Sequence, residues 1–362
     1  MRSLGICLFL AAVVLCSPCS TCRCSDQKQP AQTAPSPSPD LVDLTVIKSL
    51  LGESTQVSTT DHFAIVHEVG ANYIPGTSRT LEVGYTQFYQ VFSLAGFDLT
   101  RSADRLAWVC FPQQSKFDEY ALRVEGTDLS WLDGYYSTLT NRVAVVEPSP
   151  RLPQRDKADA SAKSDGNSAD SAANADRHEE VLAMSAVDSQ MDIARLTHEL
   201  AHQLAFNSGL QKRGIMYPFW VSEGLATNFE FDWLVGTGFA NCSTARRDCL
   251  IRSREAGELI PLRQFVVQLK SPANASRSRR YYAQAWAFFQ YLLTERSENL
   301  RNYLVRLSKL APGQRTPKTL LREFTDSFGS PEEIESSWNA FLDRQAQQAQ
   351  ASAASISVAS QE

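Results

Sequence analysis

The chain has 362 residues, with 35 Lys and Arg against 40 Asp and Glu, which gives a formal net charge of −5. Hydrophobic residues make up 43% of the chain and aromatic residues 10%, as in ordinary globular proteins. A mildly acidic chain presents no broad cationic face, so nucleic acid is not an expected partner, and no apolar run of the ~18–20 residues that span a bilayer follows the leader. The composition favours one or two soluble domains.

The first 24 residues are typical of an export signal. Arg2 precedes an apolar run over residues 4–15, which has the length of a secretory core and is too short to cross a bilayer. Lipidation requires a small residue before the modified cysteine, and this is missing for Cys16, Cys19 and Cys22. We therefore expect an exported protein of the periplasm, the cell envelope or the medium, with a lipid anchor disfavoured.

Only three of the eight cysteines lie beyond this leader, namely Cys110, Cys242 and Cys249. The mature chain is thus poor in cysteine. In an exported protein Cys242 and Cys249 could close a short disulfide loop, and Cys110 would then be a buried free thiol.

Three further segments lack the large apolar side chains that a core needs. Residues 25–42 and 148–180 are rich in small, polar and charged residues, and residues 345–362 are rich in Gln, Ala and Ser. Such segments can bury too little apolar surface to compensate for the conformational entropy lost on folding. We therefore expect a disordered tether over residues 25–42, a disordered insertion over residues 148–180 and a disordered tail over residues 345–362. Residues 43–147 and 181–344 are left to form the core.

The first of these core segments alternates between strand-like and helix-like patterns. Runs of β-branched and aromatic residues predict strands over residues 62–67, 106–111 and 141–147. Apolar residues at helical spacing predict a helix over residues 79–97. This half is expected to be α/β.

The second core segment has mostly helical patterns. Ser189 is the expected N-cap of a helix that ends near Asn207 or Gly209. Amphipathic spacing predicts further helices over residues 281–293 and 300–310. The chain is therefore expected to be α/β in front and helical behind, which is an α+β fold class.

The segment His198-Glu199-Leu200-Ala201-His202 has the H-E-x-x-H arrangement. Residues four apart on an α-helix project to the same side, so His198 and His202 can offer two imidazoles to one metal ion. They face away from an apolar stripe on the same helix, which favours a position on a cleft wall. The stripe consists of Leu196, Leu200 and Leu204. The alternative is a solvated helix on which these side chains make only surface contacts.

A catalytic zinc ion takes three protein ligands and a water molecule, so a third ligand is required. No histidine follows His202, and Ala205 and Ser208 exclude the longer motif that continues with Gly and His. A carboxylate is therefore expected, and Glu223 stands at the start of the next helical pattern. Glu230, about two turns further on, is the fallback ligand.

The segments 198–202 (HELAH), 220–226 (WVSEGLA) and 282–286 (YAQAW) together resemble the gluzincin clan of zinc metallopeptidases, within the peptidase-MA-like group of exported bacterial proteins. The likeness spans roughly residues 43–342. It implies a zincin-like fold with a mixed-sheet upper lobe and a mainly helical lower lobe that carries the H-E-x-x-H helix. It also implies that the last strand of the upper lobe, residues 141–147, is an edge strand at the cleft.

The same resemblance points to two supporting residues. Tyr282 resembles the tyrosine that precedes a helix in related proteins and would donate to the oxyanion, with Tyr281 as the neighbouring alternative. Thr227 stands four residues after Glu223, where several relatives have a carboxylate that supports a zinc-bound histidine. A hydroxyl at that position leaves this supporting role open.

Chemistry and resemblance together indicate an exported metallopeptidase with one Zn²⁺ per chain. His198, His202 and Glu223 would bind the ion, and Glu199 would act as general base. The partner would be a peptide or protein substrate that pairs with the edge strand. The alternative is a zinc-containing envelope binding or assembly protein with little turnover. A third interpretation is autoproteolysis within the 148–180 insertion.

Overall fold

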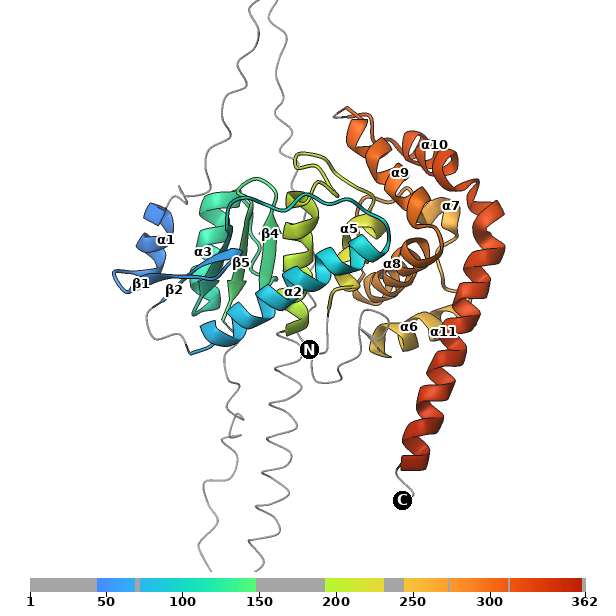
Figure 1. The fold of residues 1–362 in the computed structure, drawn as a ribbon, viewed down its shortest axis with the longest axis horizontal. Helices are drawn as coiled ribbons and strands as arrows, with labels where there is room; N and C mark the ends of the chain where they lie inside the picture. Colours follow the sequence, from blue (N-terminus) through green and yellow to red (C-terminus); the bar gives the residue numbers. More distant parts are fainter. Residues whose placement is uncertain are drawn as a thin grey trace, which may run out of the picture.

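A computed structural model describes residues 44–68, 72–147, 193–230, 244–272, 274–311 and 313–359 (Figure 1). The predicted export signal, tether and insertion lie outside these residues, as does Cys242 with its predicted disulfide. Among the helices of the described ranges, none is both long and apolar enough to cross a membrane.

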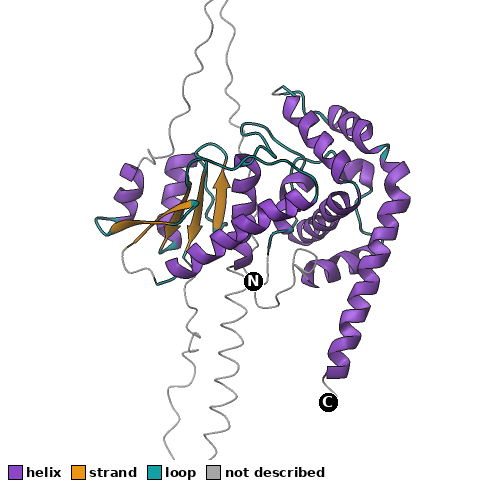
Figure 2. Ribbon diagram, viewed as in Figure 1, coloured by secondary structure: helices purple, strands orange, loops and turns teal. Residues whose placement is uncertain are grey.

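A five-stranded mixed sheet forms the first half of the fold, in the order β1-β2-β3-β5-β4 (Figures 1 and 2). Strands β2, β3 and β5 are parallel, and β1 and β4 pair antiparallel at the two edges. The strands are β1 (Thr55–Thr59), β2 (Phe63–Glu68), β3 (Leu106–Phe111), β4 (Gly134–Ser137) and β5 (Arg142–Val146). The three strands predicted from the sequence are confirmed as β2, β3 and β5.

The prediction that residues 141–147 form an edge strand, in contrast, is wrong. Strand β5 lies inside the sheet, where Val143 is the register partner of Trp108 in β3 and of Tyr136 in β4. The edge is formed by β4. Its four residues are too few to show an alternating pattern, so sequence periodicity did not predict this strand.

Helices cover both faces of the sheet (Figure 1). Successive side chains of a strand point to opposite faces, and in β3 Trp108 packs into one hydrophobic cluster while Val109 packs into another. The first cluster includes α2 and the H-E-x-x-H helix, and the second includes α1 and α3. These helices are α1 (Leu44–Leu51), α2 (Ile74–Leu94), α3 (Gln114–Glu125) and the H-E-x-x-H helix, described over residues 193–207. Burial on both faces explains why β3 is a continuous apolar run.

The second half of the fold is helical (Figure 2). Its helices are α5 (Phe219–Thr227), α6 (Thr244–Glu255), α7 (Leu262–Phe265), α8 (Ala275–Glu295), α9 (Ser297–Lys309), α10 (Pro317–Phe328) and α11 (Pro331–Ala359). Helices α8 and α9 confirm the predictions over residues 281–293 and 300–310. The cluster that contains Trp108 continues through these helices, so the sheet and the helical half share one core. The fold class is α+β, as expected.

Helix α11 corrects the prediction of a disordered tail. It continues to Ala359 and so includes most of residues 345–362. Its first half is anchored in the core by Trp338 and Phe341. Ala and Gln have high intrinsic helix propensity, so an anchored helix can extend through a segment that has no apolar stripe of its own.

Helices α5 and α8 approach closely at Gly224. A Cβ atom added there would lie 2.5 Å from the carbonyl oxygen of Ala285. The Asn228 side chain fixes the same contact, because its Nδ2 donates to the carbonyl oxygens of Gly224 and Trp286 at 2.6 and 2.9 Å. This contact sets the place of α5, and with it that of the neighbouring Glu223.

Replacing Gly224 by alanine should destabilise the protein by about 1–3 kcal/mol, because the new methyl group overlaps a backbone oxygen of α8. The matched control is Gly76→Ala in α2, where no atom lies within 4 Å of an added Cβ. There alanine should be neutral or stabilising, since it is favoured over glycine in helices by about 0.5–1 kcal/mol. Denaturant unfolding measures both effects, and equal stabilities of Gly224→Ala and wild type would contradict this account of the packing.

Candidate metal centre

The H-E-x-x-H helix is fastened to the sheet by amide side chains. Gln203 accepts from Trp108 Nε1 at 2.8 Å, and its own Nε2 donates to the carbonyl oxygens of Ala107 and Asn141, both at 3.2 Å. Asn207 exchanges two hydrogen bonds with Asn141, at 2.7 and 3.0 Å. These bonds join one side of the helix to β3 and to the turn between β4 and β5, so the helix cannot rotate without breaking them.

The apolar stripe of the helix packs as the sequence indicates. Leu196, Leu200 and Leu204 are buried in the core that includes α2, and Gly84 of α2 lets Leu200 approach closely. The imidazoles of His198 and His202 therefore point toward α5. They are only 5% and 1% exposed, so both side chains are buried.

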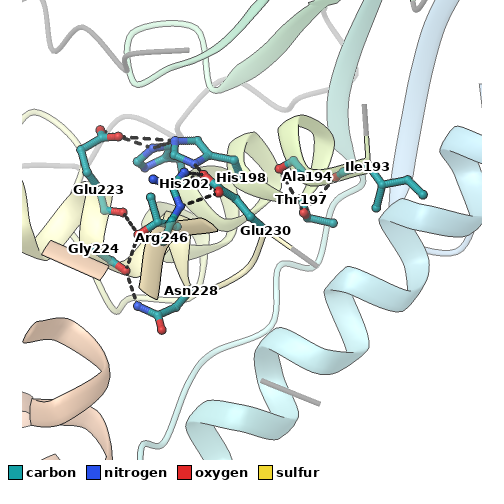
Figure 3. A network of polar contacts seen from close by, with 11 residues as sticks. Ile193, Ala194, Thr197, His198, His202, Glu223, Gly224, Asn228, Glu230 and Arg246 are labelled. Atoms are coloured by element: carbon teal, nitrogen blue, oxygen red, sulfur yellow. Dashed lines mark hydrogen bonds and ion pairs between the residues drawn. The ribbon is translucent and has the colours of Figure 1, made fainter. Parts of the chain in front are cut away.

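Three side chains converge at this place (Figure 3). The Nε2 atoms of His198 and His202 are 3.2 Å apart. The carboxylate of Glu223 lies 3.4 Å from Nε2 of His198 and 3.6 Å from Nε2 of His202. Ligand atoms about 2.0–2.1 Å from a tetrahedral metal ion are separated by ~3.4 Å, so the three distances match a shared metal ion. The group could hold a metal ion.

The hydrogen bonding of these residues supports the same interpretation. Both carboxylate oxygens of Glu223 are buried, and they face Nε2 of His198 and of His202 at 3.4 and 3.6 Å. A buried carboxylate without a donor or a cation is strongly unfavourable. The predicted ligand set His198, His202 and Glu223 is therefore brought together with a charge that a cation would balance.

The carboxylates of Glu223 and Glu230 favour a positive charge on the neighbouring His198. Burial lowers the pKa of His198, but the hydrogen bonds to Glu223 and Glu230 outweigh it and raise that pKa to about 10. Burial, and then the nearby His198, hold the pKa of His202 well below its usual value, so His202 is neutral as a metal ligand must be. The site thus combines the neutral imidazole of His202 with the imidazole of His198, whose carboxylate neighbours favour a positive charge, and a metal ion would replace the proton of His198.

Glu230 supports His198 from the side opposite to Glu223. Its Oε1 accepts from Nδ1 of His198 at 2.9 Å, which leaves Nε2 directed at the ligand group. Arg246 of α6 pairs with the same carboxylate, with its Nε 2.9 Å from Oε2. Burial would raise the pKa of Glu230, but Arg246 and then His198 outweigh it and lower it, so the carboxylate is ionised. Glu230, the predicted fallback ligand, therefore binds the ligand His198.

Thr227 does not take the supporting position that the resemblance suggested. Its hydroxyl donates to the carbonyl oxygens of Glu223 and Gly224 within its own helix, at 2.7 and 3.1 Å. The carboxylate that supports the histidine comes from Glu230, three residues further on. The spacing after Glu223 indicated that a side chain there would hydrogen-bond a histidine ligand, but it did not indicate that this residue is Glu230. No sequence pattern indicated the role of Arg246.

Of the two predicted catalytic residues, Glu199 follows His198 in the chain, and Tyr282 contacts Arg246, the partner of Glu230. Glu199 is 2% exposed, and the backbone of Tyr136 in the edge strand β4 forms a hydrogen bond with its carboxyl group. The ring of Tyr282 lies 5.8 Å from the guanidinium carbon of Arg246. Tyr281, the alternative, packs on Phe219 in the core. Of the two tyrosines, Tyr282 is the one that contacts a residue of the site.

The sequence model of a family described as "Protein of unknown function (DUF1570)" matches residues 192–314. The matched segment is about a third of the chain, and it contains the candidate metal ligands together with Glu230, Arg246 and Tyr282. No curated protein matches the chain. The chain is thus similar to this family over the part that forms the candidate metal centre.

Substitutions at Glu230 and Thr227 should separate their roles. Glu230→Gln should weaken metal binding about 10–100-fold, because the supporting charge on His198 is lost. Thr227→Val removes a hydroxyl that donates to carbonyl oxygens within α5, so it should leave metal affinity unchanged. Competition with a chromophoric chelator measures both affinities. The reverse order of effects would restore Thr227 as the support.

Proposed function

We propose that the protein is an exported zinc-dependent peptidase with a zincin-like catalytic unit. The proposal rests chiefly on the convergence of His198, His202 and Glu223 at metal-ligand distances. Glu199, next to the first ligand in the chain, supplies a carboxyl group that metal binding does not use. A site with a spare base beside three ligands fits hydrolysis better than metal storage.

Zinc is the proposed metal because two imidazoles and one carboxylate are a ligand set that zinc takes in hydrolytic enzymes. A bound zinc ion would polarise a substrate carbonyl group and lower the pKa of a water molecule toward ~7. His198, His202 and Glu223 would hold it. Proton transfer and stabilisation of the oxyanion would be carried out by side chains of the protein.

Glu199 would take the proton from the attacking water and pass it to the leaving amine. Burial, partly offset by His198, raises the pKa of its carboxyl group to about 7, and a base with a pKa near the working pH transfers protons most effectively. Tyr282 would donate its hydroxyl hydrogen to the carbonyl oxygen as negative charge develops there. Both roles require the substrate carbonyl group to lie between these side chains.

An extended peptide is the proposed substrate because a sheet edge lies beside the general base. Strand β4 forms this edge of the described sheet, and an extended substrate would lie along it. The backbone of Tyr136 in β4 contacts Glu199. Backbone pairing would select unfolded or flexible segments over folded proteins.

The burial of the ligands favours a second candidate function. His202 and Glu223 are each 1% exposed, which is typical of a closed metal site. The protein would then be a zinc-containing envelope binding or assembly protein with little turnover. A purely structural zinc ion takes four protein ligands, however, and needs no general base.

The Glu199→Gln variant should lose peptide hydrolysis by about 10²–10⁴-fold, because an amide cannot accept the proton. It should keep its fold and its zinc, since Glu199 is not a ligand. Cleavage of a diverse set of unfolded proteins, with metal content measured on the same samples, tests this. The matched control is Glu82→Gln, which changes a carboxylate paired with His62 away from the site and should leave cleavage unchanged.

A wild-type protein that binds zinc and cleaves no member of this set would favour the second candidate. Equal cleavage by wild type and Glu199→Gln would contradict the proposed role of Glu199 as general base.

A further inference from the structure

A chain of contacts leads from the metal ligands to helix α6. His198 bonds to Glu230, which follows α5, and Glu230 pairs with Arg246 in the first turn of α6. The guanidinium group of Arg246 lies over the ring of Tyr282 in α8. One arginine thus contacts both the support of a metal ligand and the proposed oxyanion donor (Figure 3 shows Arg246, Glu230 and His198).

The pair between Arg246 and Glu230 is buried and is made at two points. The side chains are 12% and 10% exposed. Nε of Arg246 donates to Oε2 of Glu230 at 2.9 Å, and Nη2 donates to Oε1 at 2.5 Å. A two-point contact between a planar guanidinium and a carboxylate fixes the orientation of the carboxylate as well as its charge.

This orientation matters because the same Oε1 atom accepts from His198. Without Arg246, the buried Glu230 would lose the two-point contact that orients its carboxylate and the cation that offsets its desolvation, so it would turn toward water. Nδ1 of His198 would then lose a fixed, charged acceptor. The imidazole would no longer be held with Nε2 facing Glu223 and His202.

We propose that Arg246 is a positioning residue that sets the metal affinity of the site through Glu230 and His198. This inference rests on the proposed metal centre but not on peptidase activity. Helix α6 thereby becomes part of the metal centre although it contributes no ligand. The contact with Tyr282 places the arginine beside the proposed oxyanion donor as well, so one residue joins the two parts of the site.

A double-mutant cycle on zinc affinity tests this proposal. Arg246→Ala and Glu230→Gln should each weaken zinc binding about 10–100-fold in competition with a chromophoric chelator. The zinc affinity of the double variant should equal that of whichever single variant binds zinc more weakly, because both changes break the same chain of contacts. Arg246→Lys keeps the charge but not the two-point contact, so its affinity should lie between those of Arg246→Ala and wild type.

The matched control is Arg254→Ala on the same helix. Arg254 pairs with Asp343 of α11 at 2.7 Å, so its loss removes an ion pair that holds α6 without touching the metal centre. Its zinc affinity should equal that of wild type. Thermal unfolding in excess chelator shows whether each variant is folded, and Arg246→Lys keeps the test decisive if Arg246→Ala is not.

Wild-type zinc affinity in Arg246→Ala and Arg246→Lys would overturn the inference and leave the metal centre standing. Losses that add in the double variant, or an equal loss in Arg254→Ala, would show that Arg246 acts through general stability instead. A wild-type protein that binds no zinc would overturn the metal centre and this inference together.

Discussion

The buried carboxyl group of Glu223 is the constraint on which the arrangement of the site depends. Its carboxyl group is 1% exposed, and its oxygens face Nε2 of His198 and of His202 at 3.4 and 3.6 Å. A carboxyl group buried so deeply needs a positively charged partner, which a protonated His198 or a metal ion would supply. The imidazoles of His198 and His202 stand where they would share a metal ion with the carboxylate. A metal ion held by these three side chains would account for the burial and the ligand geometry together.

The surrounding structure holds these side chains in place from several directions. Gln203 and Asn207 fasten the H-E-x-x-H helix to the sheet, and Gly224 allows α5 to approach α8. Glu230 and Arg246 fix the ring of His198. A metal site needs its ligands held to within about 0.5 Å, and here each support comes from a rigid element or a buried bond. The sheet, whose edge strand contacts Glu199, completes the same unit.

Much of the site could be predicted from the sequence because it depends on helical periodicity. The spacing of His198 and His202 places both imidazoles on one side of a helix, and the absence of later histidines leaves a carboxylate as third ligand. The long amphipathic helices and the apolar strands were predicted for the same reason. Such local patterns carry the information that periodicity can express.

The features that were missed depend on contacts between distant segments. Arg246 meets Glu230 across sixteen residues of chain with no pattern of its own. Thr227 matched the expected spacing, yet its hydroxyl bonds within α5. The interior place of β5 depends on pairing with β4, which is too short to detect. The tail is helical because Ala and Gln have high intrinsic helix propensity, and this does not produce the apolar stripe by which the other helices were predicted.

The most direct test of the central claim is the metal content of the purified protein by elemental analysis. The measurement includes the wild type, Glu223→Ala, and the double variant His198→Ala, His202→Ala. The account predicts about one zinc ion per chain in the wild type and none in either variant, because a site with three ligands cannot retain the ion after losing its carboxylate or both imidazoles. A wild type without metal, or variants that keep it, would contradict the assignment of these three residues as ligands.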